Sequence, residues 1–328
     1  IKRVPYRSYS SSNGEDTLLK ENDYTIGMYN INTTDVMLLF TNLGNYLYLP
    51  VYDIPECKWK DLGKHISNII PLMDDEKIVH SMFVSDFDEE KYITSFSKNG
   101  MIKRTLLNEF KAQRYSKPIK MMNLKDDDEI VNVTDSSDRE VFVATSCGYG
   151  LWYDVSEVPV VGIKAAGVKS INLKDDYVVS GILFNAGSEY ITILTDKGTG
   201  KRVKLLEFEK TSRAKRGILL MKVIKSNPSM VISVYIEDSK SLIGIVSDNY
   251  TKEVKITEIP IMDRYSNGSY VIKDRILSSY NIKGMETYNN DKEKEDKTSV
   301  KVEKSAVSLK EIDDKLSSID SIINDSYE

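Results

Sequence analysis

Basic residues return at the same place in several stretches of this chain, directly after a glycine that ends a short apolar run. The clearest cases follow Gly100 and Gly198. The basic residues of interest are Lys2, Arg3, Arg7, Lys103, Arg104, Lys111, Arg114, Lys117, Lys164, Lys169, Lys201, Arg202, Lys204, Arg213, Lys215 and Arg216. Lysine and arginine neutralise phosphates and release counterions from a nucleic acid. One such cluster is typical of any solvated strand face, but its recurrence predicts a basic band for a phosphate backbone.

Motifs of catalysis and cofactor binding are not visible in the sequence. It has no HExxH, GxxxxGK[ST], GxSxG or strand-to-helix GxGxxG pattern. The stretch from Gly198 to Lys201 is similar to a phosphate loop, but it falls in the turn of a repeated hairpin, where glycine has a structural role. A count of two histidines and two cysteines argues against a metal site built from those ligands. We therefore expect no catalytic residue, metal or cofactor in this stretch.

The charge of the chain is unevenly distributed. Of the chain's 45 basic and 50 acidic residues, 285–328 hold seven lysines and twelve acids, which leaves 38 of each for 1–284. A basic face on the neutral body must be balanced by an acidic one elsewhere. No apolar run approaches the ~18 residues of a membrane span, and no signal peptide opens the chain. We expect a cytoplasmic piece of a longer polypeptide with no membrane partner.

A strand–turn–strand pattern positions the basic residues and occurs five times. Its copies are 37–44, 92–100, 141–148, 190–198 and 242–250, with turn positions 56, 48, 50 and 52 residues apart. Glycine at the turn suits a backbone with positive φ; the last copy has Asn249-Tyr250 there, so that hairpin should turn differently. An apolar closing segment follows each hairpin, and a further strand then leads into the next copy.

A period of about fifty residues with four strands per unit is typical of a propeller-like array. The sequence therefore predicts an all-β ring of about six four-stranded blades over 1–284. Its opening residues, 1–4, are similar to the second strand of a hairpin. We interpret 1–34 as part of a blade whose other strands lie upstream or come from the other end of the chain.

The tail, 285–328, differs from the body. Its first part is a mixed-charge run without a core, which predicts disorder. Ser308 and Glu311 then form a candidate capping box before an apolar stripe at helical spacing that ends at Ile323. We expect a short amphipathic helix that must dock either on its own chain or on a separate partner.

Two stretches carry a family resemblance. They are 45–50 followed by 59–71, which read NYLYLP and WKDLGKHISNIIP, and 161–173, which reads VGIKAAGVKSINL. These resemble the C-terminal domains of the A subunits of bacterial type IIA topoisomerases, the gyrase and topoisomerase IV family. The resemblance covers about 1–283. It implies a β-pinwheel, a propeller-like ring whose blades exchange strands, with duplex DNA bent around a basic rim.

The resemblance also implies where the rest of the machinery lies. The catalytic tyrosine, the Mg²⁺ region and the ATPase would belong to the remainder of the A subunit and to the B subunit of a heterotetramer. Gyrase A subunits carry a Gln-Arg-Arg-Gly-Gly-Lys-Gly-like box in the first blade, whereas 8–16 reads SYSSSNGED here. This favours the topoisomerase IV branch, in which the domain presents a DNA segment for relaxation and decatenation during chromosome segregation.

Three other functions stay open at this stage. The domain could be a gyrase-type wrapping domain in spite of the missing box. It could be a propeller-type scaffold that binds protein partners and carries its basic residues incidentally. It could also be a hydrolase with its site in the ring centre, although no nucleophile motif supports that function.

Overall fold

The computed structural model describes residues 1–13, 16–20, 23–125, 127–222, 226 and 228–287. The chain divides into two compact units, 1–286 and 287–328. The helix expected beyond Ser308 and the disorder expected before it lie outside the described residues. The division into a body and a tail therefore stays a prediction. All of the repeated hairpins belong to the first unit, 1–286.

Five hairpins form the framework of the first unit, and each belongs to one blade. Their first strands are β2 (Val36–Thr41), β5 (Tyr92–Ser97), β9 (Glu140–Thr145), β13 (Tyr190–Thr195) and β17 (Leu242–Ser247). Their second strands are β3 (Asn45–Pro50), β6 (Met101–Leu106), β10 (Tyr149–Asp154), β14 (Thr199–Lys204) and β18 (Thr251–Lys255). The turn glycines of the first four, such as Gly100 with φ +80°, have the positive φ expected of them. Neither Asn249 nor Tyr250 has a positive φ, so the last hairpin does turn differently.

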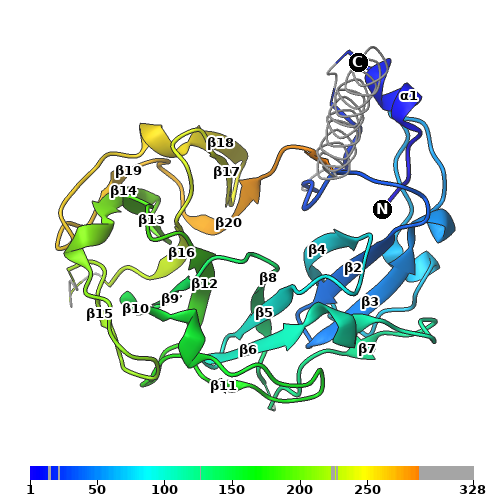
Figure 1. Ribbon diagram of the computed structural model, residues 1–328. Helices are drawn as coiled ribbons and strands as arrows, with labels where there is room; N and C mark the ends of the chain where they lie inside the picture. Colours follow the sequence, from blue (N-terminus) through cyan, green and yellow to red (C-terminus); the bar gives the residue numbers. More distant parts are fainter. Residues whose placement is uncertain (14–15, 21–22, 126, 223–225, 227, 288–328) are drawn as a thin grey trace, which may run out of the picture. The chain divides into compact units, whose positions relative to one another are not determined.

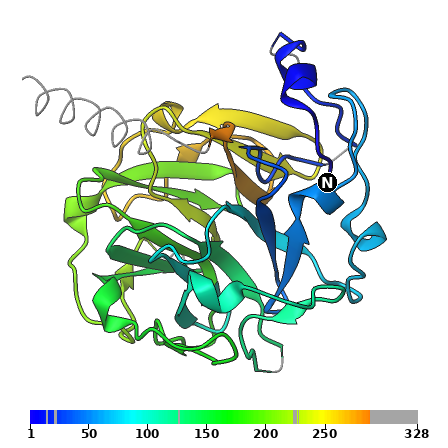
Figure 2. The same cartoon turned by 45° about the vertical axis from the view of Figure 1, so that its right-hand side comes forward.

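An inner strand completes one side of each hairpin. These strands are β4 (Ile78–Val84), β8 (Ile130–Thr134), β12 (Val178–Phe184), β16 (Val231–Tyr235) and β20 (Ile276–Ile282). Each pairs antiparallel with the first strand of its own hairpin. Figure 1 shows the five strands toward the middle of the ring, and Figure 2 shows the blades following one another in chain order.

The fourth strand of a blade comes from the next repeat. The donated strands are β7 (Ile119–Lys120), β11 (Val168–Lys169), β15 (Ile218–Leu219) and β19 (Ser269–Tyr270). They pair with β3, β6, β10 and β14 respectively. They lie on the outer side of the ring (Figure 1). The all-β ring and its strand exchange are thus confirmed.

The number of complete blades differs from the six expected. Four sheets have four strands, the sheet β18-β17-β20 has three, and β1 (Tyr29–Asn30) pairs with β21 (Glu286–Thr287). The fifth sheet is short by one because each fourth strand is donated by a following hairpin, and the described residues hold no sixth hairpin. A short helix, α1 (Tyr6–Ser10), was also not expected within the body.

Apolar side chains fill the spaces between neighbouring blades. One cluster packs Leu38 and Phe40 of β2 against Ile93 of β5, and another packs Phe96 of β5 against Val141 and Val143 of β9. Two more continue this arrangement between the third, fourth and fifth blades. Each blade therefore buries its faces only against its neighbours, which is why an alternating strand pattern repeats through the chain.

Candidate nucleic-acid interface

The segments that connect one blade to the next run along the outer edge of the ring. Each follows a short 3-10 turn after the second hairpin strand, and all but the first lead into the strand donated to the preceding blade. We call these segments the rim loops: 55–65, 111–118, 160–167, 210–217 and 260–268. The 3-10 turns before them are η1 (Val51–Asp53), η3 (Leu107–Phe110), η4 (Val155–Glu157), η5 (Leu205–Glu207) and η6 (Ile256–Glu258), and η2 (Ile66–Asn68) follows the first rim loop.

Parallel bridges tie four rim loops to the blade edge. They are Arg3–Glu56, Arg104–Val160, Trp152–Lys210 and Arg202–Ile261. The loop then reverses at a glycine before its donated strand. Gly167 has φ +79°, and a Cβ there would clash with the carbonyl oxygen of Ile102. Glycine is therefore required by both the backbone angle and the close approach.

The rim loops present five of the sixteen predicted cations fully to solvent. Lys111, Arg114 and Lys117 are exposed on rim loop 111–118. Other predicted cations that are exposed are Arg7, Lys164, Lys169, Lys204 and Lys215. Arg216 is half-buried, with its guanidinium 4.0 Å from the ring centre of Tyr149. Lys111, Arg114, Lys117, Lys164, Lys215 and Arg216 thus lie on rim loops, whereas Arg7, Lys169 and Lys204 lie in α1, β11 and β14.

Two predicted cations are not available to a phosphate. Lys103 is 1% and Lys201 is 2% exposed. The Lys103 ammonium donates to the carbonyls of Met121 and Ile163. The Lys201 ammonium donates to those of Asp263, Arg264 and Ser266 at 3.2, 2.6 and 2.7 Å. We correct their assignment as DNA contacts: both point into the blade edge beneath a rim loop.

The arginines beside these lysines are also held by the protein. Arg104 donates to the carbonyl of Val155 and lies 4.5 Å from the ring centre of Tyr92. Arg202 donates to Ile259 and Thr257 and lies over Tyr190. Their guanidinium groups fix the start of a rim loop, so a role in phosphate binding would be secondary.

Three further predicted cations are engaged in the same way. The Lys2 ammonium donates to the carbonyls of Trp59 and Asp61 at 2.6 and 2.7 Å. Arg3 donates to Ile54 and pairs with Glu56 at 3.2 Å. Arg213 donates to the carbonyls of Glu157 and Lys169. Internal partners therefore occupy much of the donor capacity of these side chains.

The charge of a rim loop depends on the residue beneath it. Aligned on the hairpin glycine, Leu47, Lys103, Leu151 and Lys201 occupy one position. The loops over Leu47 and Leu151, which are 111–118 and 210–217, carry formal charges of +3 and +4 with no acidic residue. The loops over Lys103 and Lys201, 160–167 and 260–268, carry +1 and 0. The formal basic charge is therefore concentrated on alternate blades. In loop 210–217, however, Lys210 pairs with Glu140 and Asp154 at 2.8 and 3.1 Å, so Lys215 and Arg216 are the cations left for DNA.

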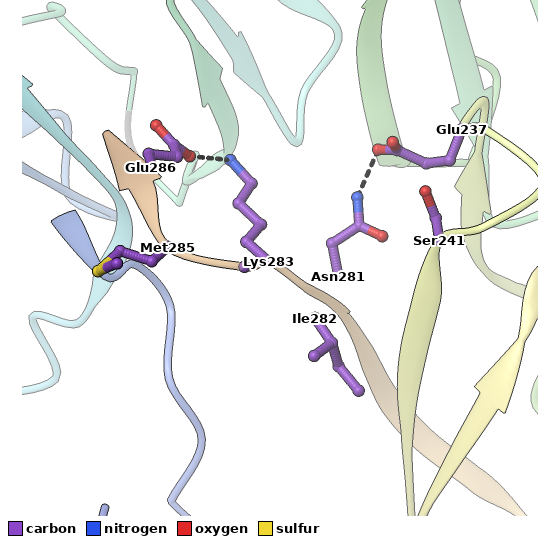
Figure 3. Close-up of a pocket in the computed structure, with 8 residues that line it drawn as sticks. Glu237, Ser241, Asn281, Ile282, Lys283, Met285 and Glu286 are labelled. Carbon is purple, nitrogen blue, oxygen red and sulfur yellow. Dashed lines mark hydrogen bonds and ion pairs between the residues drawn. The ribbon is translucent and has the colours of Figure 1, made fainter. Parts of the chain in front are cut away.

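A cavity of about 350 Å³ lies away from the rim loops. It is lined by Glu237, Ser241 and 281–286. Figure 3 shows its polar side chains in two pairs: Asn281 donates to Glu237 at 2.5 Å, and Lys283 lies 3.9 Å from Glu286. Burial raises the pKa of Glu237. Its charged groups are thus directed at one another rather than at an open ligand site.

Two further searches concern metals and membranes. Within the described ranges, no group of three or more His, Cys, Asp or Glu side chains is placed to hold a metal ion. No helix in the same ranges is long and apolar enough to cross a membrane.

Comparison with known proteins found a matching family model and similar curated proteins. A family model described as the DNA gyrase C-terminal domain, beta-propeller, matches residues 35–85, 91–135, 139–185 and 189–236. The A subunit of DNA topoisomerase 4 from Bacillus subtilis (strain 168) is 45% identical over 273 residues, which cover 82% of this chain and 34% of that protein. The Staphylococcus epidermidis protein of the same name is 37% identical, with 83% and 34% covered. The chain thus spans about a third of the length of these curated relatives.

Solved structures give the same result. The C-terminal domain of DNA topoisomerase IV matches with a TM-score of 0.83 and 44% identity, covering 86% of this chain and 90% of that one. The DNA gyrase A C-terminal domain matches with a TM-score of 0.62 over 81% of this chain and 95% of that one, but at 19% identity it supports the fold alone.

Proposed function

Because the chain belongs to the DNA gyrase C-terminal domain family, we propose that it binds and bends duplex DNA as the C-terminal domain of a topoisomerase 4 A subunit. The observation that carries this proposal is the placement of exposed cations on the rim loops. Lys111, Arg114 and Lys117 are exposed on one rim loop, and Lys215 is exposed beside the half-buried Arg216 on the rim loop two blades further on. A duplex that follows the outer edge of a ring meets such positions in turn and must bend to reach both.

The rest of the parent protein supplies the chemistry in this proposal. The matched 273 residues are 34% of the curated relative, so most of an A subunit lies beyond the part that this chain matches. We expect the nucleophile that cleaves DNA and the Mg²⁺ region to lie there, and the ATPase to belong to the B subunit of a heterotetramer. This domain would hold a DNA segment for strand passage, on the nucleoid in the cytoplasm.

Two alternatives remain distinguishable by experiment. A gyrase-type domain would wrap DNA chirally and introduce supercoils, whereas the relatives with high identity are topoisomerase 4 A subunits. A protein-interaction scaffold would show DNA affinity that does not depend on salt, because it would not release counterions.

The test replaces three exposed cations of rim loop 111–118. We expect Lys111→Ala, Arg114→Ala and Lys117→Ala together to weaken binding to all duplex sequences alike, since phosphate contacts carry no sequence information. The slope of log affinity against log salt should flatten by up to ~0.9 per lost contact. Fluorescence anisotropy of a labelled duplex over a salt series measures both quantities.

A matched control removes the same charge elsewhere. Lys77, Lys125 and Lys174 are exposed and lie in the acidic turns that lead to inner strands rather than in rim loops. Their triple replacement by alanine should leave the slope near that of the unaltered protein. Equal effects of the two triple variants would show that only net charge matters and that the rim loops are not the DNA path.

A further inference from the structure

Lysines beneath three rim loops occupy one structural position in the ring, and two of them, Lys103 and Lys201, are buried. The carbonyls of Ile1, Ile102 and Gly200 lie against the rim glycines Gly63, Gly167 and Gly268, respectively. The next residue in each strand is a lysine: Lys2, Lys103 and Lys201. The position is therefore defined by contacts of the backbone, independently of any sequence alignment.

The three ammonium groups reach the same part of their loops. Each donates to the carbonyl of the residue four before the rim glycine, which is Trp59, Ile163 or Arg264. Each has at least one further oxygen partner, such as Asp61 for Lys2 or Ser266 for Lys201. Lys2 and Lys201 thus join a blade edge to two points of the loop that crosses it, whereas Lys103 joins the edge to Ile163 of its loop and to Met121, which follows β7.

Hydrogen bonding explains why a charge stands at this buried position. Carbonyl oxygens of an irregular loop that are cut off from water must find donors, and an ammonium group offers three. Burial lowers the pKa of Lys103 and of Lys201 to about 8, so both carry their proton near neutral pH. Leucine at the equivalent positions 47 and 151 provides no donor, and the loops above it take the higher positive charge.

We propose that Lys103 is a positioning residue for DNA: it holds rim loop 160–167 and thereby fixes Lys164 and Lys169, which contact phosphates. Lys201 holds rim loop 260–268 through the same kind of hydrogen bonds. The proposal rests on the DNA-binding function above and deepens it. Because Lys103 is buried, its ammonium group cannot contact a phosphate; it acts on DNA only through the loop that it holds.

Leucine is the informative replacement, because the same ring carries it at positions 47 and 151. Lys103→Leu should therefore keep the blade folded while it leaves the carbonyls of Met121 and Ile163 without their donor. Hydrogen exchange should become at least several-fold faster at the amides of Val161 and Ala165, which bond to Arg104 and Gly162. Exchange in the paired strands β5 and β6 should not change.

A double-mutant cycle separates positioning from general destabilisation. In the otherwise unaltered protein, Lys103→Leu should weaken duplex binding about 3- to 10-fold, the scale of one or two lost phosphate contacts. In a Lys164→Ala, Lys169→Ala background it should have almost no effect, because the groups that Lys103 positions are already gone. Lys125→Ala is the control, because its effect on duplex affinity should be the same in both backgrounds.

The outcomes are distinct. Unchanged exchange at Val161 and Ala165 in Lys103→Leu overturns the proposal, whatever the DNA affinity. Faster exchange with full affinity, or an equal loss in both backgrounds, also overturns it and leaves the DNA-binding function intact. An unaltered protein with no salt-dependent DNA affinity defeats the proposed function itself, and the positioning role with it.

Discussion

At the scale of single residues, the strand period decides which basic side chains meet solvent. Successive residues of a strand face opposite sides, so the lysine and arginine of a Lys-Arg pair have different surroundings. Lys103 is turned into the blade edge, while Arg104 lies on the ring of Tyr92. Five of the eight predicted cations that are exposed lie instead in the irregular rim loops.

The buried lysines make stability depend on pH. The pKa of Lys103 falls from 10.5 to about 8 on burial, and that of Lys201 does the same. Between these values the unfolded chain binds more protons than the folded one, so the free energy of unfolding should rise with pH. Each pKa unit corresponds to ~1.4 kcal/mol per group.

Denaturant unfolding between pH 8 and pH 10 measures this effect. The Lys103→Leu, Lys201→Leu double variant lacks both groups, so its stability should rise less over the same interval. Equal pH slopes in the two proteins would mean that these lysines keep an ordinary pKa in the folded state.

The hairpins and some of the exposed cations could be predicted from the sequence. The repeated glycines predicted the hairpins and their turns, and exposed lysines on 111–117 were found by composition. The burial of Lys103 and Lys201 was missed because their basic neighbours suggested a solvated face. The sequence did contain a signal of this burial. Leu47 and Leu151 lie as far from their hairpin glycines as Lys103 and Lys201 do, and both leucines are buried.

At the scale of elements, the donated strand is what joins one blade to the next. The apolar closing segments were predicted from the sequence, but their pairing with the preceding blade depends on contacts between repeats. Composition alone does not specify such a contact; the family resemblance did. The missing fourth strand of the β17–β18 sheet follows from the same rule, because no later hairpin is described that would donate it.

The reversal of rim loop 160–167 should depend strongly on its last glycine. Gly167→Ala puts a Cβ on a backbone with φ +79°, in a clash with the Ile102 carbonyl oxygen. We expect a loss of about 1–3 kcal/mol from backbone strain, with a further cost from displacing β11. The midpoint of urea unfolding measures the change.

Gly162→Ala is the control within the same loop. A Cβ at that position meets nothing within 4 Å, so its effect should stay within about 0.5 kcal/mol, as for other surface changes. If both variants were equally stable, the close approach at Gly167 would not hold the donated strand.

At the scale of the whole ring, alternate blades differ in what they offer to DNA. The loops over Leu47 and Leu151 are strongly basic, and those over Lys103 and Lys201 are nearly neutral. Two separated basic loops on a curved edge provide two anchors for one duplex. Bending a short duplex between anchors costs on the order of 1–6 kcal/mol, which the phosphate contacts at both loops must offset.

DNA bending tests this account most directly. Energy transfer between dyes at the two ends of a duplex of about 40 base pairs should increase when the protein binds, because the bent ends approach one another. Removing the available cations of either basic rim loop, by Lys111→Ala, Arg114→Ala and Lys117→Ala or by Lys215→Ala and Arg216→Ala, should abolish the increase at protein concentrations that still saturate the DNA. A bound duplex whose energy transfer stays at the value of free DNA, or whose bend survives the loss of both loops, would contradict a DNA path along the rim.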